Sequence, residues 1–128
     1  MKDFDNWNKE KKKINEFNSN KDYKVREIWW CQMGVNIGFE QDGTGRQNSR
    51  PVLIIRGFSK QVCLIVPLTS SIKTNQFRLS IGKINQRPAV ALISQIRLID
   101  TKRLIRKICY LSKPIFEEIK KSTRDLIQ

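Results

Sequence analysis

Short apolar runs separated by polar stretches predict a chain of β-strands through most of the sequence. The runs are rich in β-branched and aromatic residues, and they lie at 25–34, 51–58, 61–68, 89–94 and 107–111. Residues 76–82 alternate apolar and polar side chains, as a half-buried strand does. The runs at 51–58 and 61–68 flank a tight turn around Gly57–Lys60 and predict a hairpin. Strands this short, joined by polar loops, favour a small antiparallel barrel with helices added.

Two amphipathic segments predict helices at the ends of the chain. In residues 4–17 one face carries three apolar residues, Trp7, Ile14 and Phe17. A polar linker follows at 18–22. Near the C-terminus, Ser112 offers an N-cap and Pro114 suits the first turn of a helix reaching about Ile127. The apolar face of that helix comprises Ile115, Phe116, Ile119 and Leu126.

The chain has 128 residues and a mass of 15.1 kDa, which suits one compact domain. We expect residues 1–24 to form a helical extension with its linker, and residues 25–128 to form the barrel domain. No stretch approaches the ~20 apolar residues of a membrane span, and the N-terminus is too polar for a signal peptide. We therefore expect a cytoplasmic protein without membrane attachment.

Histidine is absent, and the three cysteines are far apart in the sequence. Without histidine the chain lacks the usual general base, the usual zinc ligand and every Ser-His-Asp or Cys-His arrangement. Cys31, Cys63 and Cys109 each sit in an apolar run and form no C-x-x-C motif, which indicates buried thiols in a reducing compartment. We expect neither a metal site nor a cofactor.

Positive charge is concentrated in the middle of the chain. The formal net charge is +13, and residues 41–99 carry nine basic side chains against one acid, Asp42. The first 24 residues are nearly balanced, with seven basic and five acidic side chains. Such a field favours a polyanion such as nucleic acid as partner. From charge alone, a solubilising surface or a patch for an acidic protein is an equally simple interpretation.

Six short fragments follow one another between residues 26 and 104: "REIWW", "GFEQ", "RPVLII", "VPLTS", "SQIRLID" and "KRL". In this order they resemble the MazF/PemK toxins of bacterial type II toxin–antitoxin systems, over about residues 25–128. The resemblance implies a mainly β (α+β) fold, a small SH3-like antiparallel barrel with a C-terminal helix, working as a homodimer. It also implies an acidic antitoxin partner, together with which the toxin would bind DNA. The implied activity is metal-independent cleavage of single-stranded mRNA at short motifs, leaving 2′,3′-cyclic phosphate and 5′-hydroxyl ends and inhibiting growth.

The resemblance assigns the catalytic roles to Arg50 of the "RP" motif and Thr69 of "PLTS". Phosphoryl transfer needs a positive group beside the phosphorane oxygens, on which negative charge develops. A guanidinium is suited to this role because it forms two parallel hydrogen bonds to phosphate. Pro51 restricts Arg50 to an extended backbone and so helps to aim it from the strand edge. Without the resemblance, a surface arginine and a threonine bonded to its own backbone would be the simpler interpretations.

Glu40 matches the acid of the family's "G-x-E-Q" loop. Its carboxylate could order the loop, contact an RNA base or take the proton of the attacking 2′-hydroxyl. The last role is considered because arginine stays charged in proteins and is a poor base. A structural pairing of Glu40 with Arg46 or Arg50 is an equally good interpretation.

Other residues would support the RNA site: Phe39, Gln41, Arg46, Ser70, Gln95 and Arg97. Ser70 offers a second hydroxyl, and Gln95 and Arg97 form the family's "Q-x-R" motif. Trp29, Trp30 and Phe39 could stack on bases, although strand alternation leaves at most one of the two tryptophans free. The residues that continue the motif are expected to be structural, namely Asp100, Arg103 and Leu104.

This chain departs from the family pattern at three places. PemK-like members carry an aspartate at the position of Ser94 and a histidine at the position of Phe39, so we expect the MazF-like Arg/Thr chemistry. The loop between "EQ" and "RP" is longer than usual, which leaves the cleavage motif open. The helix at 1–17 is an addition to the core family.

Two alternatives share the barrel but not the chemistry. One is a non-catalytic nucleic-acid-binding barrel, and the other is a gyrase-poisoning toxin that binds a protein. The Arg50–Thr69 pair and the basic middle of the chain favour the endoribonuclease.

Overall fold

The computed structural model describes residues 20–34 and 49–127. Within these ranges the chain forms seven strands, two 3₁₀ turns and one α-helix. The strands are β1 (Glu27–Gln32), β2 (Ser49–Gly57), β3 (Val62–Thr69), β4 (Arg78–Ile84), β5 (Arg87–Leu92), β6 (Arg97–Asp100) and β7 (Leu104–Tyr110). The 3₁₀ turns are η2 (Ile93–Gln95) and η3 (Thr101–Arg103), and the helix is α2 (Lys113–Leu126).

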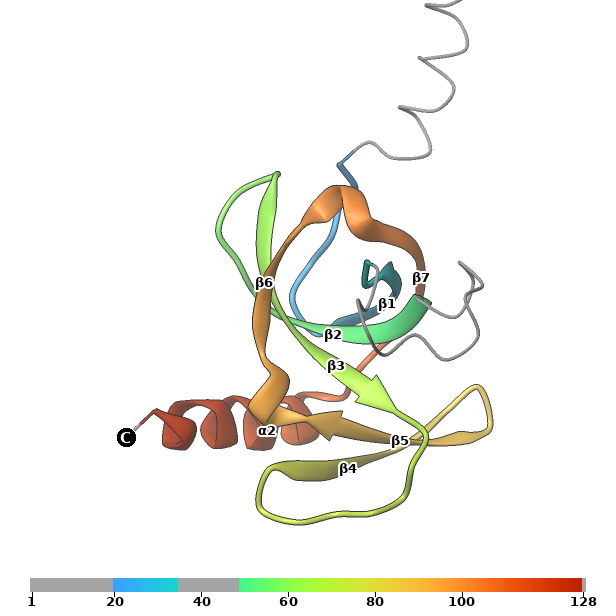
Figure 1. Ribbon diagram of the computed structural model, residues 1–128, viewed down its shortest axis with the longest axis vertical. Helices are drawn as coiled ribbons and strands as arrows, with labels where there is room; N and C mark the ends of the chain where they lie inside the picture. Colours follow the sequence, from blue (N-terminus) through green and yellow to red (C-terminus); the bar gives the residue numbers. More distant parts are fainter. Residues whose placement is uncertain (1–19, 35–48, 128) are drawn as a thin grey trace, which may run out of the picture.

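Strand β3 organises the sheet because it pairs along both of its edges. The strand order is β4-β5-β3-β2-β1-β7, and every pairing is antiparallel. One edge of β3 pairs with β2, while the other pairs first with β6 and then, at Leu68 and Thr69, with β5. The β4–β5 hairpin therefore extends from the C-terminal end of β3 (Figure 1).

The remaining strands curl into a half-barrel (Figure 1). Strand β6 runs directly into β7 through η3, which brings the chain around from the β3 edge to the β1 edge. Thr101 fastens this corner to the β2–β3 turn, because its hydroxyl donates to the Lys60 carbonyl and the Gln61 carbonyl accepts from its backbone N–H at 2.9 Å. The side chain of Asp100 caps η3 by accepting from Lys102 N.

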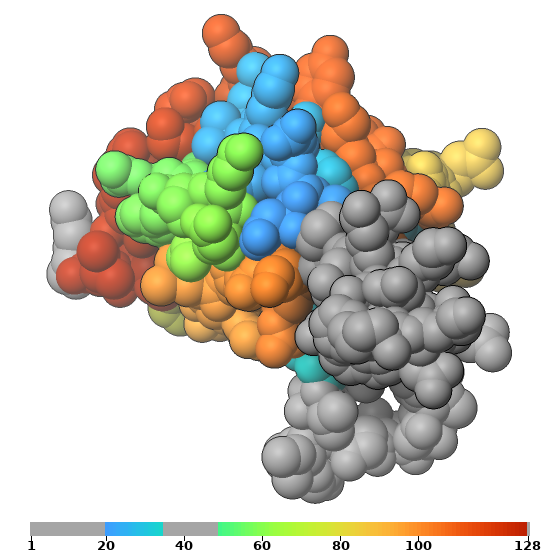
Figure 2. Space-filling model, turned by 90° about the horizontal axis from the view of Figure 1, so that it is seen from above, coloured from blue at the N-terminus to red at the C-terminus, as the bar shows by residue number. Residues whose placement is uncertain are grey.

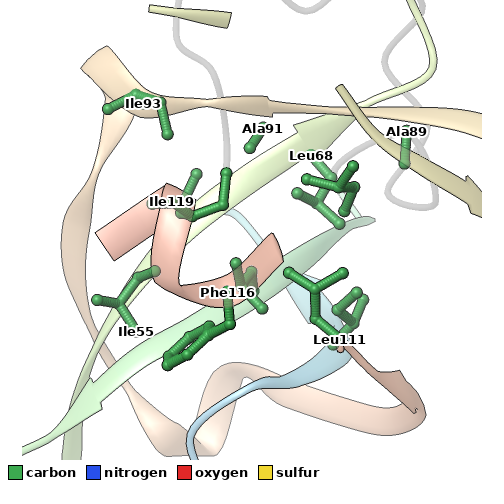
Figure 3. Packing of buried hydrophobic residues seen from close by; sticks show 12 residues of the cluster. Ile55, Leu68, Ala89, Ala91, Ile93, Leu111, Phe116 and Ile119 are labelled. Atoms are coloured by element: carbon green, nitrogen blue, oxygen red, sulfur yellow. The ribbon is translucent and has the colours of Figure 1, made fainter. Parts of the chain in front are cut away.

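Two apolar clusters occupy the two faces of the curled sheet. The inside of the curl holds Trp29, Cys31, Val52, Ile54, Cys63, Ile65, Ile99 and Leu104. The other face is covered by α2, whose Phe116 and Ile119 are 4% and 1% exposed. Figure 3 shows these two side chains among Ile55, Ala91 and Leu111 of the sheet side. Burial of each contributes roughly 1.5–3 kcal/mol.

The predicted mainly β, SH3-like antiparallel barrel with a C-terminal helix is confirmed. The predicted first strand, the 51–68 hairpin and the C-terminal helix match β1, β2–β3 and α2 closely. Ser112 stands at the N-cap position but makes no side-chain capping hydrogen bond. The predicted N-terminal helix, with Trp7, Ile14 and Phe17, lies outside the described residues.

The second half of the sheet differs from the prediction in its strand bounds. The strands expected at 76–82 and 89–94 instead form a tight hairpin closed by Asn85 and Gln86, whose φ angles are 51° and 68°. Positive φ at both positions is the mark of a two-residue type I′ turn. Strand β6 was not predicted, because it is only four residues long and leaves Leu98 exposed on the surface.

Strand β7 was expected only from residue 107, but it begins at Leu104. Strand β7 lies at the edge of the sheet, and its basic residues Arg106 and Lys107 are exposed. These two residues interrupt the apolar pattern from which a strand would be predicted. Because β7 is an edge strand, Cys109 is also only half-buried, whereas Cys31 and Cys63 are buried as expected.

The linker is attached to the end of the barrel that holds the β2–β3 turn. The side chain of Asn20 donates to Thr101 Oγ1 at 2.6 Å and to Asp100 Oδ1 at 3.2 Å. The Tyr23 hydroxyl donates to the Ser59 carbonyl at 2.5 Å. Figure 2 shows the linker, in blue, between the green β2–β3 turn and the orange β6–β7 corner. In this described part of the chain no helix is long and apolar enough to cross a membrane.

Candidate functional site

Arg50 lies at the second position of β2, at the end of the barrel away from the β2–β3 turn, and its side chain is exposed. Pro51 follows it inside the strand and keeps its backbone extended, as expected. Antiparallel pairing with β1 sets Arg50 opposite Cys31. The arginine is therefore held by a paired strand and not by a free loop.

Thr69 is the last residue of β3, at the same end of the sheet as Arg50. The β2–β3 register ends at Val52 opposite Pro67. Arg50 lies two residues before Val52, Thr69 lies two residues after Pro67, and both line one hollow of the surface. Residues two apart in a strand share a face. The two residues named by the "RP" and "PLTS" motifs thus lie at one end of the sheet.

The Thr69 hydroxyl is oriented by the chain that follows it. Ser71 N donates to Thr69 Oγ1 at 3.2 Å, the local side-chain to backbone bond considered from the sequence. A hydroxyl accepts through its lone pairs and still has one proton to donate. This bond therefore leaves the Thr69 proton available for a phosphate oxygen.

A hollow of about 710 Å³ opens beside this pair. Among the residues that the structure describes, its lining combines apolar side chains with hydroxyls, an amide and two arginines, and it contains no acid. The lining residues are Trp30, Ser49, Arg50, Pro51, Leu68, Thr69, Ser70, Ile84, Asn85, Arg87, Pro88, Ala89 and Ile108. A hollow of this size and composition suits part of an anionic ligand.

The two adjacent tryptophans are separated by strand alternation, as expected. Trp29 is 7% exposed in the interior cluster, and its Nε1 donates to Glu27 Oε1 at 2.9 Å. Trp30 points to the other face, is only half-buried and lines the hollow. Of the two, Trp30 is the one that can meet a ligand.

Glu27 is a buried carboxylate with a structural set of partners. Besides Trp29 it accepts from Lys24 N at 2.8 Å and pairs with Lys107 Nζ at 3.3 Å. Burial by itself raises the pKa of this carboxyl, but the hydrogen bonds from Trp29 and Lys24 and the Lys107 ammonium outweigh it, so the pKa lies below its usual value. Glu27 thus stays charged and fastens β1 to β7.

Ser70 joins the hollow, whereas Gln95 and Arg97 do not. Gln95 is exposed in η2, and Arg97 is exposed at the start of β6, opposite Ile65 on β3. Since Ile65 and Thr69 are four residues apart, Arg97 is displaced by roughly 13 Å along the strand. Neither residue lines the hollow, and Arg97 is set back from Thr69 along β3, although its charge acts on Cys31, the partner of Arg50 in β1.

Arg97 belongs to a second group of basic residues around Cys31. Burial raises the pKa of the Cys31 thiol to about 12, and the charges of Arg103 and Arg97 oppose that rise. Arg103 also donates from Nη1 to the Gln32 carbonyl at 3.2 Å, in keeping with its expected structural role. With Arg50 paired to Cys31, three arginines gather around this end of the curl.

Four predicted site residues lie outside the described residues: Phe39, Glu40, Gln41 and Arg46. Within residues 20–34 and 49–127, no three His, Cys, Asp or Glu side chains are grouped so that they could hold a metal ion.

Sequence reasoning missed the tip of the β4–β5 hairpin as part of the site. Asn85 and Arg87 line the hollow, although Arg87 had stood out only as one of several basic residues. The signal was the Asn85–Gln86 pair between two strand-like runs, which indicates a tight turn. That signal was weak, because a glycine usually follows the asparagine in such turns.

Comparison with known proteins supports the resemblance seen in the motifs. The family model for the PemK-like, MazF-like toxin of type II toxin–antitoxin systems matches residues 24–127. No curated protein matches the sequence.

Solved structures show a similar fold at low sequence identity. The Mycobacterium tuberculosis toxin MazF-mt6 is 17% identical with a TM-score of 0.62, over 80% of this chain and 96% of that one. MazF from Deinococcus radiodurans is 19% identical with a TM-score of 0.62, over 83% and 98%. An endoribonuclease in complex with its cognate antitoxin, from a mycobacterial species, is 12% identical with a TM-score of 0.62, over 83% and 95%.

Proposed function

The chain belongs to the PemK-like, MazF-like toxins of type II toxin–antitoxin systems, and from this membership we propose that it is an endoribonuclease that cleaves single-stranded mRNA. The observation that supports the proposal is that Arg50 of β2 and Thr69 of β3, at adjacent strand ends, line one hollow. The lining of this hollow, among residues 20–34 and 49–127, contains no acid. Among the described residues of that lining, the only charges are the two positive ones of Arg50 and Arg87, which attract a phosphate.

The proposed reaction is an internal transfer at one phosphate. The ribose 2′-oxygen attacks the adjacent phosphorus, the bond to the 5′-oxygen of the next nucleotide breaks, and a 2′,3′-cyclic phosphate forms. Arg50 stabilises the negative charge that develops on the phosphorane oxygens. The Thr69 hydroxyl donates a hydrogen bond to one of the same oxygens.

Proton transfer completes the step. The 2′-hydroxyl gives up its proton as it attacks, and the departing 5′-oxygen gains a proton from water. We propose Glu40 as the acceptor, because arginine is a poor base and the chain has no histidine. No metal ion is required for this balance.

The proposed partners follow from the family and from the charge. A second copy of the chain forms a homodimer, and an acidic antitoxin binds the basic surface. Among the similar structures, one is an endoribonuclease in complex with its cognate antitoxin. We expect the protein to act in the cytoplasm, where mRNA is found.

The test is to incubate the purified protein with a long single-stranded RNA in EDTA and to map the new ends. Discrete cuts with 2′,3′-cyclic phosphate and 5′-hydroxyl ends are expected. Duplex RNA should resist, because A-form geometry keeps the 2′-oxygen out of line with the leaving oxygen. A strict requirement for magnesium, or binding without any cleavage, would contradict the proposal.

A further inference from the structure

We propose that the hollow beside Arg50 and Thr69 holds a nucleotide of the bound RNA, with its base stacked on Trp30 and its phosphate held by Arg87. The inference rests on the proposed function, because it takes single-stranded RNA as the ligand. It adds a binding site for a nucleotide next to the cleaved phosphate, formed by one face of β1 and the tip of the β4–β5 hairpin.

The first observation is the position of Trp30 at the edge of the covered sheet. Ile28 and Leu53 lie on the face that α2 covers and are both 0% exposed. Trp30 and Pro51 are the next residues along that face on the two strands, and they pair with each other. Both remain half-buried and border the hollow. The indole is thus fixed by a paired strand while part of it faces open space.

The second observation is the chemistry that surrounds the indole. Apolar walls come from Ile84, Pro88 and Ile108, which suit the flat faces of a base. Asn85 and the hydroxyls of Ser49 and Ser70 offer the donors and acceptors that the edge of a base requires. This combination of an aromatic platform and short polar groups is how proteins bind unstacked bases of single-stranded RNA.

The third observation is the charge. Arg87 is exposed at the first position of β5, across the hairpin from Ile84. The described part of the lining contains two arginines and no acid, so these residues favour an anion in the hollow. An apolar ligand would gain nothing from these arginines, whereas a nucleotide uses both the platform and the charge.

The hollow is also continuous with the proposed catalytic pair. Strand alternation directs Arg50 and Thr69 to the interior face and Trp30 and Pro51 to the opposite face. Because Arg50 and Thr69 stand at strand ends, the same hollow reaches them. An RNA strand that crosses these ends can place a phosphate on Arg50 and an adjoining base on Trp30.

The test measures binding apart from cleavage. A 5′-fluorescein-labelled, single-stranded 2′-O-methyl RNA of random sequence lacks the attacking hydroxyl, and its affinity is read by fluorescence anisotropy at fixed salt. We expect Trp30→Ala to weaken binding by about tenfold or more, and Trp30→Phe to retain most of the affinity. Arg87→Ala should weaken binding and reduce the salt slope by about 0.7, the value of one phosphate contact on a single strand.

The matched control is Phe58→Ala. Phe58 is an aromatic side chain with 55% exposure, lies 5.3 Å from the Arg56 guanidinium, and follows β2 at the far end of the barrel. Its removal should leave the affinity unchanged within about twofold. Equal losses in Trp30→Ala and Phe58→Ala would overturn the site, since they would show general aromatic contact.

The outcomes separate this site from the proposed function. If RNA is cut in EDTA but Trp30→Ala and Arg87→Ala both bind like the wild type, the site is wrong and the endoribonuclease stands. If no RNA is cut but binding depends on Trp30 and Arg87, the site stands and the endoribonuclease is wrong. If Trp30→Ala changes the mass measured by light scattering, so that Trp30 contacts a second copy, the stacking role is overturned. If Trp30→Ala does not fold, the Arg87→Ala result and mapping of a 5-iodouridine crosslink to Trp30 in the wild type decide.

Discussion

Arg50 and Thr69 owe their positions to antiparallel register. Neither residue is buried, so no core packing holds their side chains, and the backbone alone brings them together. This arrangement leaves the Arg50 guanidinium free to follow a phosphate as its charge grows. It also makes the two residues separable by mutation, because neither substitution removes a buried group.

Arg50→Ala should reduce the cleavage rate by about 10²–10³-fold. Stabilisation of a developing oxyanion is typically worth ~3–4 kcal/mol, and each 1.36 kcal/mol is a factor of ten. Arg50→Lys should recover little, since it keeps the charge but loses the paired hydrogen bonds. Single-turnover cleavage measures the effect, and anisotropy with the 2′-O-methyl RNA should show a much smaller loss of affinity. A folded Arg50→Ala that cuts at the wild-type rate would show the site to be wrong.

Thr69→Ala should also impair cleavage, whereas Thr69→Ser should retain most of it. Serine keeps both the acceptor for Ser71 N and the proton that faces the phosphate. The double variant Arg50→Ala/Thr69→Ala should lose less cleavage rate than the product of the two single fold-losses, because both groups act on one phosphate. The same assay measures all three variants. If Thr69→Ser lost as much activity as Thr69→Ala, the methyl group of Thr69, and not its hydroxyl, would be the group that matters.

Glu27→Gln should lower the free energy of unfolding by about 1–2 kcal/mol at pH 7. The substitution weakens charge-assisted hydrogen bonds to a buried group. Because the pKa of Glu27 is lowered on folding, its carboxylate stabilises the fold at pH values above its usual pKa of 4.5. This stabilisation is lost as the pH falls through the lower pKa of the folded state. Urea titrations from pH 7 to pH 3 should therefore show the two proteins converging in acid. Glu117→Gln is the control, because the Glu117 side chain is 63% exposed and its 3.9 Å contact to Lys120 is a surface pair.

The sequence predicted Arg50 and Thr69 through two short motifs, and the structure brings them together. Strand alternation predicted that at most one of Trp29 and Trp30 could meet a ligand, but the sequence did not show which one. Arg87 could not be placed at all, because its distance from Trp30 depends on how the β4–β5 hairpin lies against β2 and β3. Such contacts between distant segments leave no local pattern in the chain.

The β4–β5 hairpin is the element with the most unusual local backbone. Asn85 and Gln86 both adopt positive φ, and Gly82 lies in β4 with a φ of 96° at a register shift. Asparagine tolerates this region well, but glutamine pays a steric cost of roughly 1–2 kcal/mol. The tip of the hairpin thus keeps its shape through the pairing of its strands.

Gln86→Gly should stabilise the fold by about 0.5–1 kcal/mol. Glycine adopts positive φ without strain, and its greater freedom in the unfolded chain offsets part of that gain. Gly82→Ala is the contrasting change and should destabilise the protein, since its backbone favours glycine although there is open space around it. Thermal unfolding followed by circular dichroism measures both. A lower midpoint for Gln86→Gly would mean that the Gln86 side chain makes contacts that outweigh the strain.

Strands and helices formed by long apolar runs could be predicted from the sequence, whereas strands formed by short polar segments could not. Strands β2 and β3 are apolar over most of their length because they are covered on both faces. Strand β6 and the start of β7 alternate with basic residues, and their strand structure comes from pairing with β3 and β1. Helix α2 was predictable because its apolar residues repeat at helical spacing.

Taken as a whole, the described protein presents its basic residues on a surface with few acids to balance them. Residues 49–99 contain eight basic side chains and no acid. The two ion pairs in the described part of the chain, Lys107–Glu27 and Lys120–Glu117, both lie outside this stretch. Within residues 20–34 and 49–127, this charge is therefore not neutralised by ion pairs.

RNA affinity should fall steeply with salt. Each phosphate contact on a single strand contributes about −0.7 to the slope of log K against log salt. Anisotropy titrations between 50 and 300 mM KCl are expected to give a slope of about −2 or steeper. A slope near zero would mean that the basic surface does not contact the RNA backbone.

Strand β3 pairs with three other strands, β2, β5 and β6, and its amides should therefore exchange slowly with solvent. Strands at the edges, such as β4 and β7, can release their amide protons by local opening. The amides of residues 63–65 in β3 lie between β2 and β6, so they should exchange only when the whole domain unfolds and should be among the slowest in native-state exchange. Thr69 would then end a strand that rarely opens, while the hairpin tip that carries Arg87 opens more often.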